Sequence, residues 1–369
     1  MENQANMENM GLTECLNTYR NKRVLITGHT GFKGAWLSIW LKTLGAEVIG
    51  YALDPSHESG IFSNSGISKK ITDYRGDIRD IGNLKNAFIE EKPEIVFHLA
   101  AQPLVIEGYN KPVETFEINV QGTVNVLEAV RATPSVRTVI VVTSDKCYEN
   151  CEWDWGYRES DPMGGYDPYS ASKGAAELII QAYRRSYFLP AHIGIASVRA
   201  GNVIGGGDWA DNRLVPDIFK GLEKNKVIKL RNPDSIRPWQ HVLEPLSGYL
   251  MLGIKLLENP NLFSGGWNFG PFLHDVYTVR QLTERIIAEY GQGSYETIEN
   301  KSATHEAKFL KLDISKAFSV LGWCPVMSVQ ETISQTTNWY KNYSDGCTMN
   351  LVIKQIVEYQ KKWISRNEN

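Results

Sequence analysis

R-V-L-I-T-G-H-T-G-F-K-G, residues 23–34, is the stretch of sequence that decides the fold. Its apolar run, 23–27, predicts a short strand, and the helical pattern after the glycines continues to Gly45. A strand, a glycine turn and a helix in this order allow backbone N–H groups and a helix N-terminus to bind a pyrophosphate. A purely structural turn is the alternative, because the spacing G-x-x-G-x-x-G differs from the common G-x-G-x-x-G. The candidate binding residues in this turn are Gly28, Gly31, Phe32, Lys33 and Gly34.

Further apolar runs predict that the same unit repeats along the chain. Residues 47–53, 94–99, 139–142 and 192–198 read as strands, with helical patterns between them, for example at 113–133. Alternating strands and helices predict an α/β fold, a Rossmann-type doubly wound parallel sheet.

Asp54 follows the second strand, twenty residues after Gly34. A carboxylate there can accept a hydrogen bond from a ribose 2′-hydroxyl, which favours NAD over NADP. A turn-forming aspartate before Pro55 is the alternative. Other candidates for this cofactor follow later strands or lie on the 113–133 helix, where an asparagine serves a buried hydrogen bond or a solvated face; these candidates are Asp77, Ile78, Ala100, Ala101, Gln102 and Asn119. We expect His98, inside an apolar run, to be a hydrogen-bonded core residue.

Polar side chains follow the strand at 139–142, namely Thr143, Ser144, Asp145 and Lys146. In open α/β sheets ligands bind beyond the carboxyl ends of the strands, so these side chains are candidates for an active site. An ordinary turn with a local ion pair between the aspartate and the lysine is the alternative.

Tyr169 and Lys173 open the helical segment 170–187 and lie four residues apart, which places them on one helix face. A lysine cation beside a phenol favours the phenolate and lowers its pKa, so the tyrosine is a candidate acid and base. The alternative is a half-buried tyrosine beside a solvated lysine.

The pattern changes after residue 203, where short elements rich in Pro, Trp and Arg replace the alternation. We therefore expect a leader at 1–20 that is flexible, an NAD-binding domain at 21–203 with a returning segment near 240–270, and a smaller mixed substrate domain at 204–369. The glycine-rich segment 201–210 should lie over the site. Arginine side chains suit a diphosphate, although ion pairs with surface acids are the alternative. The candidate substrate-binding residues are Asn202, Arg213, Arg231, Arg237 and His241.

Composition excludes several classes of function. A net charge of −3 argues against a general nucleic-acid-binding surface. The five cysteines are scattered, without the pairs typical of a zinc site or a disulfide framework, so we expect no metal. The first residues lack a signal-peptide pattern and no apolar run is long enough for a membrane span, which favours the cytoplasm.

The glycine turn, Ser144 and the Tyr169–Lys173 pair occur in the order found in extended short-chain dehydrogenases/reductases of the nucleotide-sugar type, which the chain resembles. The runs A-A-Q-P-L-V, T-S-D-K-C-Y, G-G-Y-D-P-Y-S-A-S-K-G, R-A-G-N-V-I-G-G-G-D-W-A and I-R-P-W-Q-H-V resemble the CDP-sugar branch of the 4,6-dehydratases, over about residues 20 to 330. Most members of the wider family carry Asp-Glu after the strand, whereas this chain, like that branch, carries Asp145-Lys146.

This resemblance implies CDP-glucose as the substrate and NAD as the cofactor. Tyr169, aided by Lys173, would take the C4 hydroxyl proton, and Ser144 or Thr143 would bind the C4 oxygen. Lys146 would then be the base at C5 and Asp145 the acid at C6, which requires an amine that is neutral part of the time and a protonated carboxyl. The resemblance also implies a dimer, or a dimer of dimers, that pairs through the Tyr169 helix.

Two other functions use the same fold. A nucleotide-sugar 4-epimerase or ketoreductase needs the tyrosine and the cofactor but no acid and base at C5 and C6. A non-catalytic NAD-binding protein would not need Tyr169 at all.

Overall fold

The computed structural model describes residues 16–272, 275–298, 309–343 and 347–367. Residues 1–15 of the expected leader lie outside this range. Leu16 and Tyr19 are buried, and the Tyr19 hydroxyl donates to the Leu250 carbonyl at 2.8 Å. The expectation of a flexible leader is therefore wrong for residues 16–20, which pack against the core.

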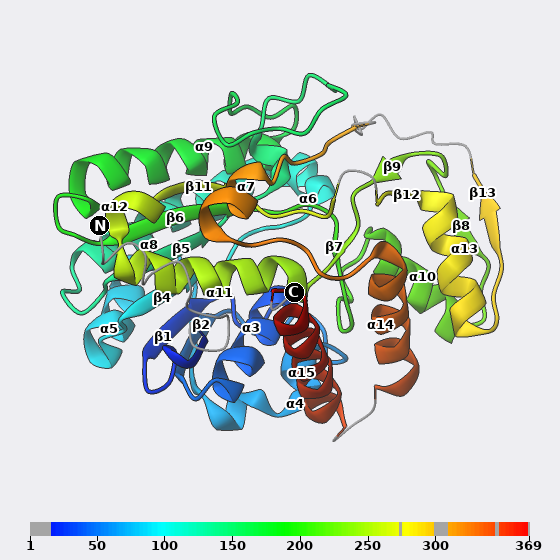
Figure 1. Ribbon diagram of the computed structural model, residues 1–369, viewed down its shortest axis with the longest axis horizontal. Coiled ribbons are helices and arrows are strands. Elements are labelled where there is room, and N and C mark those ends of the chain that lie inside the picture. The colour runs from blue at the N-terminus through cyan, green and yellow to red at the C-terminus, as the bar shows by residue number, and fades with distance from the viewer. Residues whose placement is uncertain (1–15, 273–274, 299–308, 344–346, 368–369) are drawn as a thin grey trace.

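Seven parallel strands form one sheet in the order β11-β6-β5-β4-β1-β2-β3 (Figure 1). This order and the helices on both faces confirm the predicted Rossmann-type doubly wound fold. The strands are β1 (Arg23–Thr27), β2 (Glu47–Ala52), β3 (Thr72–Arg75), β4 (Ile95–His98), β5 (Thr138–Val142), β6 (Gly194–Arg199) and β11 (Gly265–Asn268).

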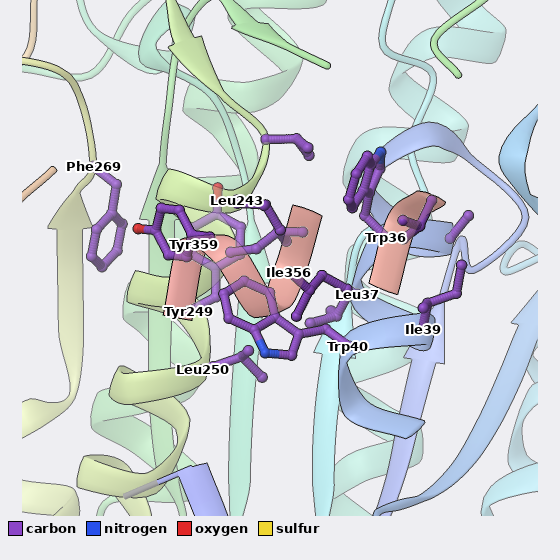
Figure 2. Close-up of a cluster of buried hydrophobic side chains, with 14 of the residues drawn as sticks. Trp36, Leu37, Ile39, Trp40, Leu243, Tyr249, Leu250, Phe269, Ile356 and Tyr359 are labelled. Carbon is purple, nitrogen blue, oxygen red and sulfur yellow. The ribbon is translucent and has the colours of Figure 1, made fainter. Parts of the chain in front are cut away.

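Apolar side chains on both faces of the strands explain why the sheet is covered twice. Val24 and Ile26 of β1 face one core, while Leu25 faces the other, because successive side chains alternate along a strand. The first core holds α3 (Phe32–Thr43), α11 (Leu243–Glu258) and α15 (Thr348–Asn367), and the second holds α5 (Ile81–Glu91), α8 (Gly122–Arg131) and α9 (Pro168–Tyr183). Figure 2 shows part of the first core, where Trp40 of α3 packs edge-on against Tyr359 of α15.

The helical segment predicted at 113–133 is not one regular helix. It consists of α7 (Pro112–Phe116), a π-helical turn η2 (Glu117–Gln121) and α8. Such turns recur at functional sites, and this one carries Asn119. Helix α9 also continues into a π-helical turn, η4 (Arg184–Phe188).

The part of the chain after β6 builds small sheets beside the large one (Figure 1, right). Strands β7 (Val203–Ile204) and β10 (Gln240–His241) pair in parallel, as do β8 (Ile228–Leu230) and β13 (Tyr295–Thr297), whereas β9 (Ile236–Arg237) and β12 (Tyr277–Thr278) pair antiparallel. The helices α10 (Leu214–Glu223), α13 (Val279–Tyr290) and α14 (Val329–Asn342) accompany these strands. The shorter elements are α4 (Ile61–Ser65), η1 (Ile67–Lys70), α6 (Val105–Asn110), η3 (Asp145–Cys147), α12 (Pro260–Phe263) and η5 (Ala317–Leu321).

Strand β11 returns to the edge of the large sheet beside β6, within the segment where a return was expected. The domain boundaries themselves stay a prediction. In the part of the chain that the structure describes, every helix is too short or too polar to span a bilayer.

Candidate active site

A cavity of about 1130 Å³ opens beyond the carboxyl ends of the central strands. It exceeds the range of about 300–1,000 Å³ that is usual for one small ligand, so it has room for more than one. Nineteen of the predicted site residues line it: Gly28, Gly31, Phe32, Lys33, Gly34, Asp77, Ile78, Ala100, Ala101, Thr143, Ser144, Asp145, Lys146, Tyr169, Lys173, Asn202, Arg213, Arg231 and Arg237.

The glycine turn between β1 and α3 is held by close backbone packing. Gly28 has φ +77°, and a Cβ on it would lie 2.6 Å from the Ala100 nitrogen. A Cβ on Gly34 would overlap the Gly28 carbonyl. Gly31 begins α3 without any side-chain cap, so the first N–H groups of the helix are available to an anion. The turn therefore fits a pyrophosphate group.

Helix α9 positions Tyr169 and Lys173. Asp167 caps the helix by accepting hydrogen bonds from the amide and hydroxyl of Ser170, at 3.0 and 2.5 Å, and Pro168 occupies the first helical position. The spacing of four residues places Tyr169, Lys173 and Glu177 on one face. All three side chains are buried.

Burial has the largest effect on both members of the Tyr169–Lys173 pair. It raises the pKa of Tyr169 to about 12, against the opposing effects of a hydrogen bond to Ser144 and the charge of Arg213. Burial also lowers the pKa of Lys173 to about 8. Ser144 and Arg213 are the groups that lower the pKa of Tyr169 most in this structure, and the expected effect of Lys173 stays a prediction.

The short turn η3 carries the second pair directly after β5. Ser144 accepts a hydrogen bond from the Lys146 amide at 3.2 Å and donates to the Asp145 carboxylate at 2.9 Å. A Cβ on Gly201 would overlap that carboxylate, so glycine is required above it. Because Lys146 and Asp145 line the same cavity as Tyr169, both candidate pairs face one space.

Thr143 and Ser144 differ in where their hydroxyls point. The Thr143 hydroxyl points toward helix α9, where it donates to the Glu177 carboxylate at 2.6 Å. The Ser144 hydroxyl lies beside Tyr169 and Asp145. Of the two alternatives for binding the C4 oxygen, the geometry favours Ser144.

Lys33 faces the charged end of the cavity. Its pKa is lowered to about 8, first by burial and then by the charge of Arg213, while Asp145 and Asp208 oppose this shift. Arg213 itself pairs with Asp208 at 3.0 Å. The ammonium group of Lys33 is therefore close enough to the carboxyl of Asp145 for their charges to interact.

Three predicted cofactor-binding residues, Asp54, Gln102 and Asn119, do not line the cavity. The Asp54 side chain is 89% exposed and lies 3.6 Å from the Arg75 guanidinium. Asn119 bonds with both the amide and the carbonyl of Gln102, and donates to the Ser172 hydroxyl at 2.9 Å. Asn119 thus makes the buried hydrogen bonds that were one of its two expected roles, and it holds Gln102 against α9.

His241 does not lie at the site. It is fully buried in β10, packs edge-on against Trp36, and burial lowers its pKa to about 3. The predicted contact of His241 with the substrate is therefore wrong in this conformation. His98 is a buried histidine as expected, with its ring between Thr27 and Thr123.

The buried ion pair between Glu177 and Arg199, behind the cavity, was not predicted from the sequence. The only local signal is the position of Glu177, one helical turn beyond Lys173. Its partner comes from β6, a contact that only the folded chain creates.

Comparison with known proteins adds the family. The model of the family described as GDP-mannose 4,6 dehydratase matches residues 25–336. The CDP-glucose 4,6-dehydratase of Salmonella typhimurium is 49% identical over 344 residues, which cover 92% of this chain and 96% of that protein. The chain belongs to this dehydratase family. It is an extended short-chain dehydrogenase/reductase, as the motifs indicated.

More distant proteins are also similar to this chain, in sequence or in fold. The dTDP-glucose 4,6-dehydratase of Neisseria gonorrhoeae is 25% identical over 88% of this chain and 97% of its own. The structure of the epimerase Mth375 from Methanothermobacter thermautotrophicus matches with a TM-score of 0.76 at 22% identity, over 93% of this chain and 97% of that one. The dTDP-glucose 4,6-dehydratase of Streptomyces venezuelae, solved with NAD bound, matches with a TM-score of 0.74 at 23% identity, over 86% and 97%.

Proposed function

We propose that the protein is an NAD-dependent CDP-glucose 4,6-dehydratase. The observation that carries this proposal is that Asp145-Lys146 and Tyr169-Lys173 line one cavity. An epimerase needs only the second pair. The 49% identity to a CDP-glucose 4,6-dehydratase supports the same substrate.

The residues around the glycine turn fit NAD. The uncapped start of α3 suits the pyrophosphate, and Asp77, Ile78, Ala100 and Ala101 extend the cavity along the sheet. We assign Lys173 to the nicotinamide ribose, and Asp54 stays the proposed partner of the adenosine ribose. When bound, NAD would supply the hydride acceptor for C4 and the hydride donor for C6.

Oxidation begins with proton transfer at C4. Tyr169 is protonated in this structure at neutral pH, since its pKa is raised to about 12. It must release that proton to solvent before it can take one from the C4 hydroxyl, and the charge of Arg213 favours this loss. Ser144 holds the C4 oxygen beside the phenol.

Water leaves in the second stage, because the C4 ketone acidifies the hydrogen on C5. Lys146 takes the C5 proton, the C6–O bond breaks, and Asp145 donates a proton so that the hydroxyl leaves as water. After hydride has returned to C6, Lys146 gives its proton back to C5. The product is a 4-keto-6-deoxy sugar nucleotide, with no net oxidation.

Arginines at the other end of the cavity suit the diphosphate of the substrate. Arg213, Arg231 and Arg237 line the cavity together with Asn202. Guanidinium groups match phosphate oxygens in charge and geometry. We therefore assign diphosphate binding to the part of the chain after residue 203.

Exposed apolar side chains on α7, α9 and η4 support the proposed dimer. Val113 of α7, Leu178 of α9 and Tyr187 of η4 are 71%, 59% and 48% exposed. Their burial against a second copy would cover this apolar surface. Light scattering should give twice or four times the monomer mass, and a clean monomer would contradict the proposal. We also propose a cytoplasmic location, which the free thiols of the described cysteines fit.

Mass spectrometry tests the function directly. We expect the purified protein with NAD to convert CDP-glucose into a product lighter by one water, and to react more slowly with dTDP- and GDP-sugars. A product of unchanged mass would indicate an epimerase. Unreacted CDP-glucose would refute the dehydratase, whereas faster reaction of another nucleotide would refute only the choice of base.

A further inference from the structure

The ion pair between Glu177 and Arg199 is buried, with about 5% and 4% of the side chains exposed. Arg199 Nε donates to Glu177 Oε1 and Arg199 Nη2 donates to Oε2, each at 2.8 Å. This is the bidentate geometry, the most directional form of a charged hydrogen bond. The pair therefore fixes α9 relative to the end of β6.

Thr143 attaches one end of the turn that follows β5 to this pair. Its hydroxyl donates to Glu177 Oε1 at 2.6 Å, and its amide donates to the Val198 carbonyl at 3.0 Å. The Ser197 hydroxyl donates to Glu177 Oε2 at 2.7 Å. Both carboxylate oxygens of the glutamate thus have two donors each.

Tyr148 attaches the other end of the same turn to the same pair. Arg199 Nη1 donates to the Tyr148 hydroxyl at 2.5 Å, and the guanidinium carbon lies 4.9 Å from the ring centroid. The Tyr148 hydroxyl donates in turn to Asn268 Oδ1 at 2.8 Å, on β11. The ring is 1% exposed.

Segment 143–148 is therefore held at both ends by one ion pair, and Ser144, Asp145 and Lys146 lie between the attachments. We infer that Glu177 and Arg199, with Thr143 and Tyr148, form a clamp that positions the elimination pair relative to Tyr169. The clamp rests on the proposed function, because it acts on the step that removes water. Its members are positioning residues.

Physical reasons favour positioning over mere stabilisation. A buried ion pair is often no more stabilising than apolar residues of the same volume, because both charges lose their hydration. Catalysis, in contrast, is sensitive to placement, and a shift of about 1 Å can cost about 10²-fold in rate. Tyr169 acts at C4 from a long helix, whereas Asp145 and Lys146 act at C5 and C6 from a three-residue turn. A looser clamp should slow elimination and leave oxidation nearly unchanged.

Tyr148→Phe tests the clamp, since it removes the hydroxyl and keeps the ring. After rapid mixing of the NAD-loaded protein with CDP-glucose, we expect reduced-cofactor absorbance to form within twofold of the wild-type rate. We expect its decay to slow by about tenfold, a fraction of the loss that such misplacement can cause. Part of the 4-keto sugar should leave with its C6 hydroxyl intact.

Hydrogen exchange of the protein without substrate gives a readout that does not depend on activity. The amides of Cys147 and Tyr148 donate within the turn, to the carbonyls of Ser144 and Asp145. In Tyr148→Phe they should exchange at least tenfold faster than in the wild type. Thr143→Val, which releases the other attachment, should have the same effect.

Tyr157→Phe is the matched control. Its ring stacks on Tyr148 at 5.2 Å, but its hydroxyl contacts Asn150 and the Cys151 amide, outside the clamp. It should keep the wild-type ratio of oxidation to elimination. The clamp is refuted if Tyr148→Phe and Thr143→Val behave like this control, or if they slow both steps equally. If wild-type protein leaves CDP-glucose unchanged, the proposed function fails, and hydrogen exchange still decides whether the clamp holds the turn.

Discussion

The two pairs of catalytic candidates rest on very different supports. Tyr169 and Lys173 lie in the sixteen-residue helix α9, which is capped at its start and packed against the sheet. Asp145 and Lys146 lie in a turn of three residues. The proposed oxidation residues are thus positioned by a regular helix. The proposed elimination residues lie in a short turn, which needs additional contacts to hold it in place.

Tyr169→Phe should have the largest effect, because it removes the group that we assign to take the C4 proton. We expect a loss of about 10³-fold or more in dehydration, near the upper range for a general base. Reduced-cofactor absorbance should not form on addition of CDP-glucose. If absorbance forms at the wild-type rate, the helix pair is not the oxidation pair.

Asp145→Asn should separate the two pairs. We expect dehydration to fall by about 10²-fold, since the C6 hydroxyl then lacks its acid, while oxidation at C4 persists. Reduced cofactor should accumulate in single-turnover absorbance measurements. Asp154→Asn, in the exposed loop that follows, is the control and should behave like the wild type. Equal loss of both steps in Asp145→Asn would contradict the assignment.

The pH dependence should reveal Lys173. Its pKa is lowered to about 8, so the cation is present below that pH and is lost above it. We expect kcat/KM to fall above about pH 8, approaching tenfold per pH unit for a single titration. Lys173→Arg keeps the charge and should move this limb to higher pH.

Lys33 is the comparison for this experiment, because its pKa is also lowered to about 8. If Lys33→Arg moves the limb and Lys173→Arg does not, the titrating group belongs to the cofactor turn. The free energy of unfolding should depend on pH in the opposite direction to kcat/KM. Between about pH 8 and the ordinary lysine value, the unfolded chain binds more protons, so stability contributed by either lysine rises with pH.

His241→Asn should have the smallest effect on activity. Because the ring is buried away from the cavity, KM for CDP-glucose should stay within twofold of wild type. The free energy of unfolding should fall by about 1–3 kcal/mol, as is usual for a changed core side chain. Denaturant unfolding and initial rates measure the two quantities. A large rise in KM with unchanged stability would restore the predicted substrate contact.

The positions of residues that belong to a local sequence pattern were predicted correctly. The glycine turn follows its strand directly, and Tyr169 and Lys173 face one cavity because of their helical spacing. Five of the seven strands of the large sheet were visible as apolar runs, whereas β3 (T-D-Y-R) and β11 (G-G-W-N) carry too few apolar residues to form such a run. Features that depend on neighbouring residues in the chain can therefore be predicted from the sequence.

Residues whose roles depend on distant partners were not predicted. The sequence around His241 did not indicate that β10 is buried and that the imidazole packs against Trp36. Glu177 meets Arg199 only after α9 has packed on β6. The helix is irregular at Asn119, where a π-helical turn accompanies the hydrogen bonds between Asn119 and Gln102. These bonds join different elements, so they could not be predicted from the local sequence.

Gly201 gives this site an unusual vulnerability. Any side chain there would collide with the Asp145 carboxylate, yet Tyr169 and Lys173 lie on a different element. We therefore expect Gly201→Ala to displace the carboxyl that we propose as the acid and to impair elimination more than oxidation. In a lineage of such proteins, one codon at this position could separate deoxysugar formation from sugar inversion.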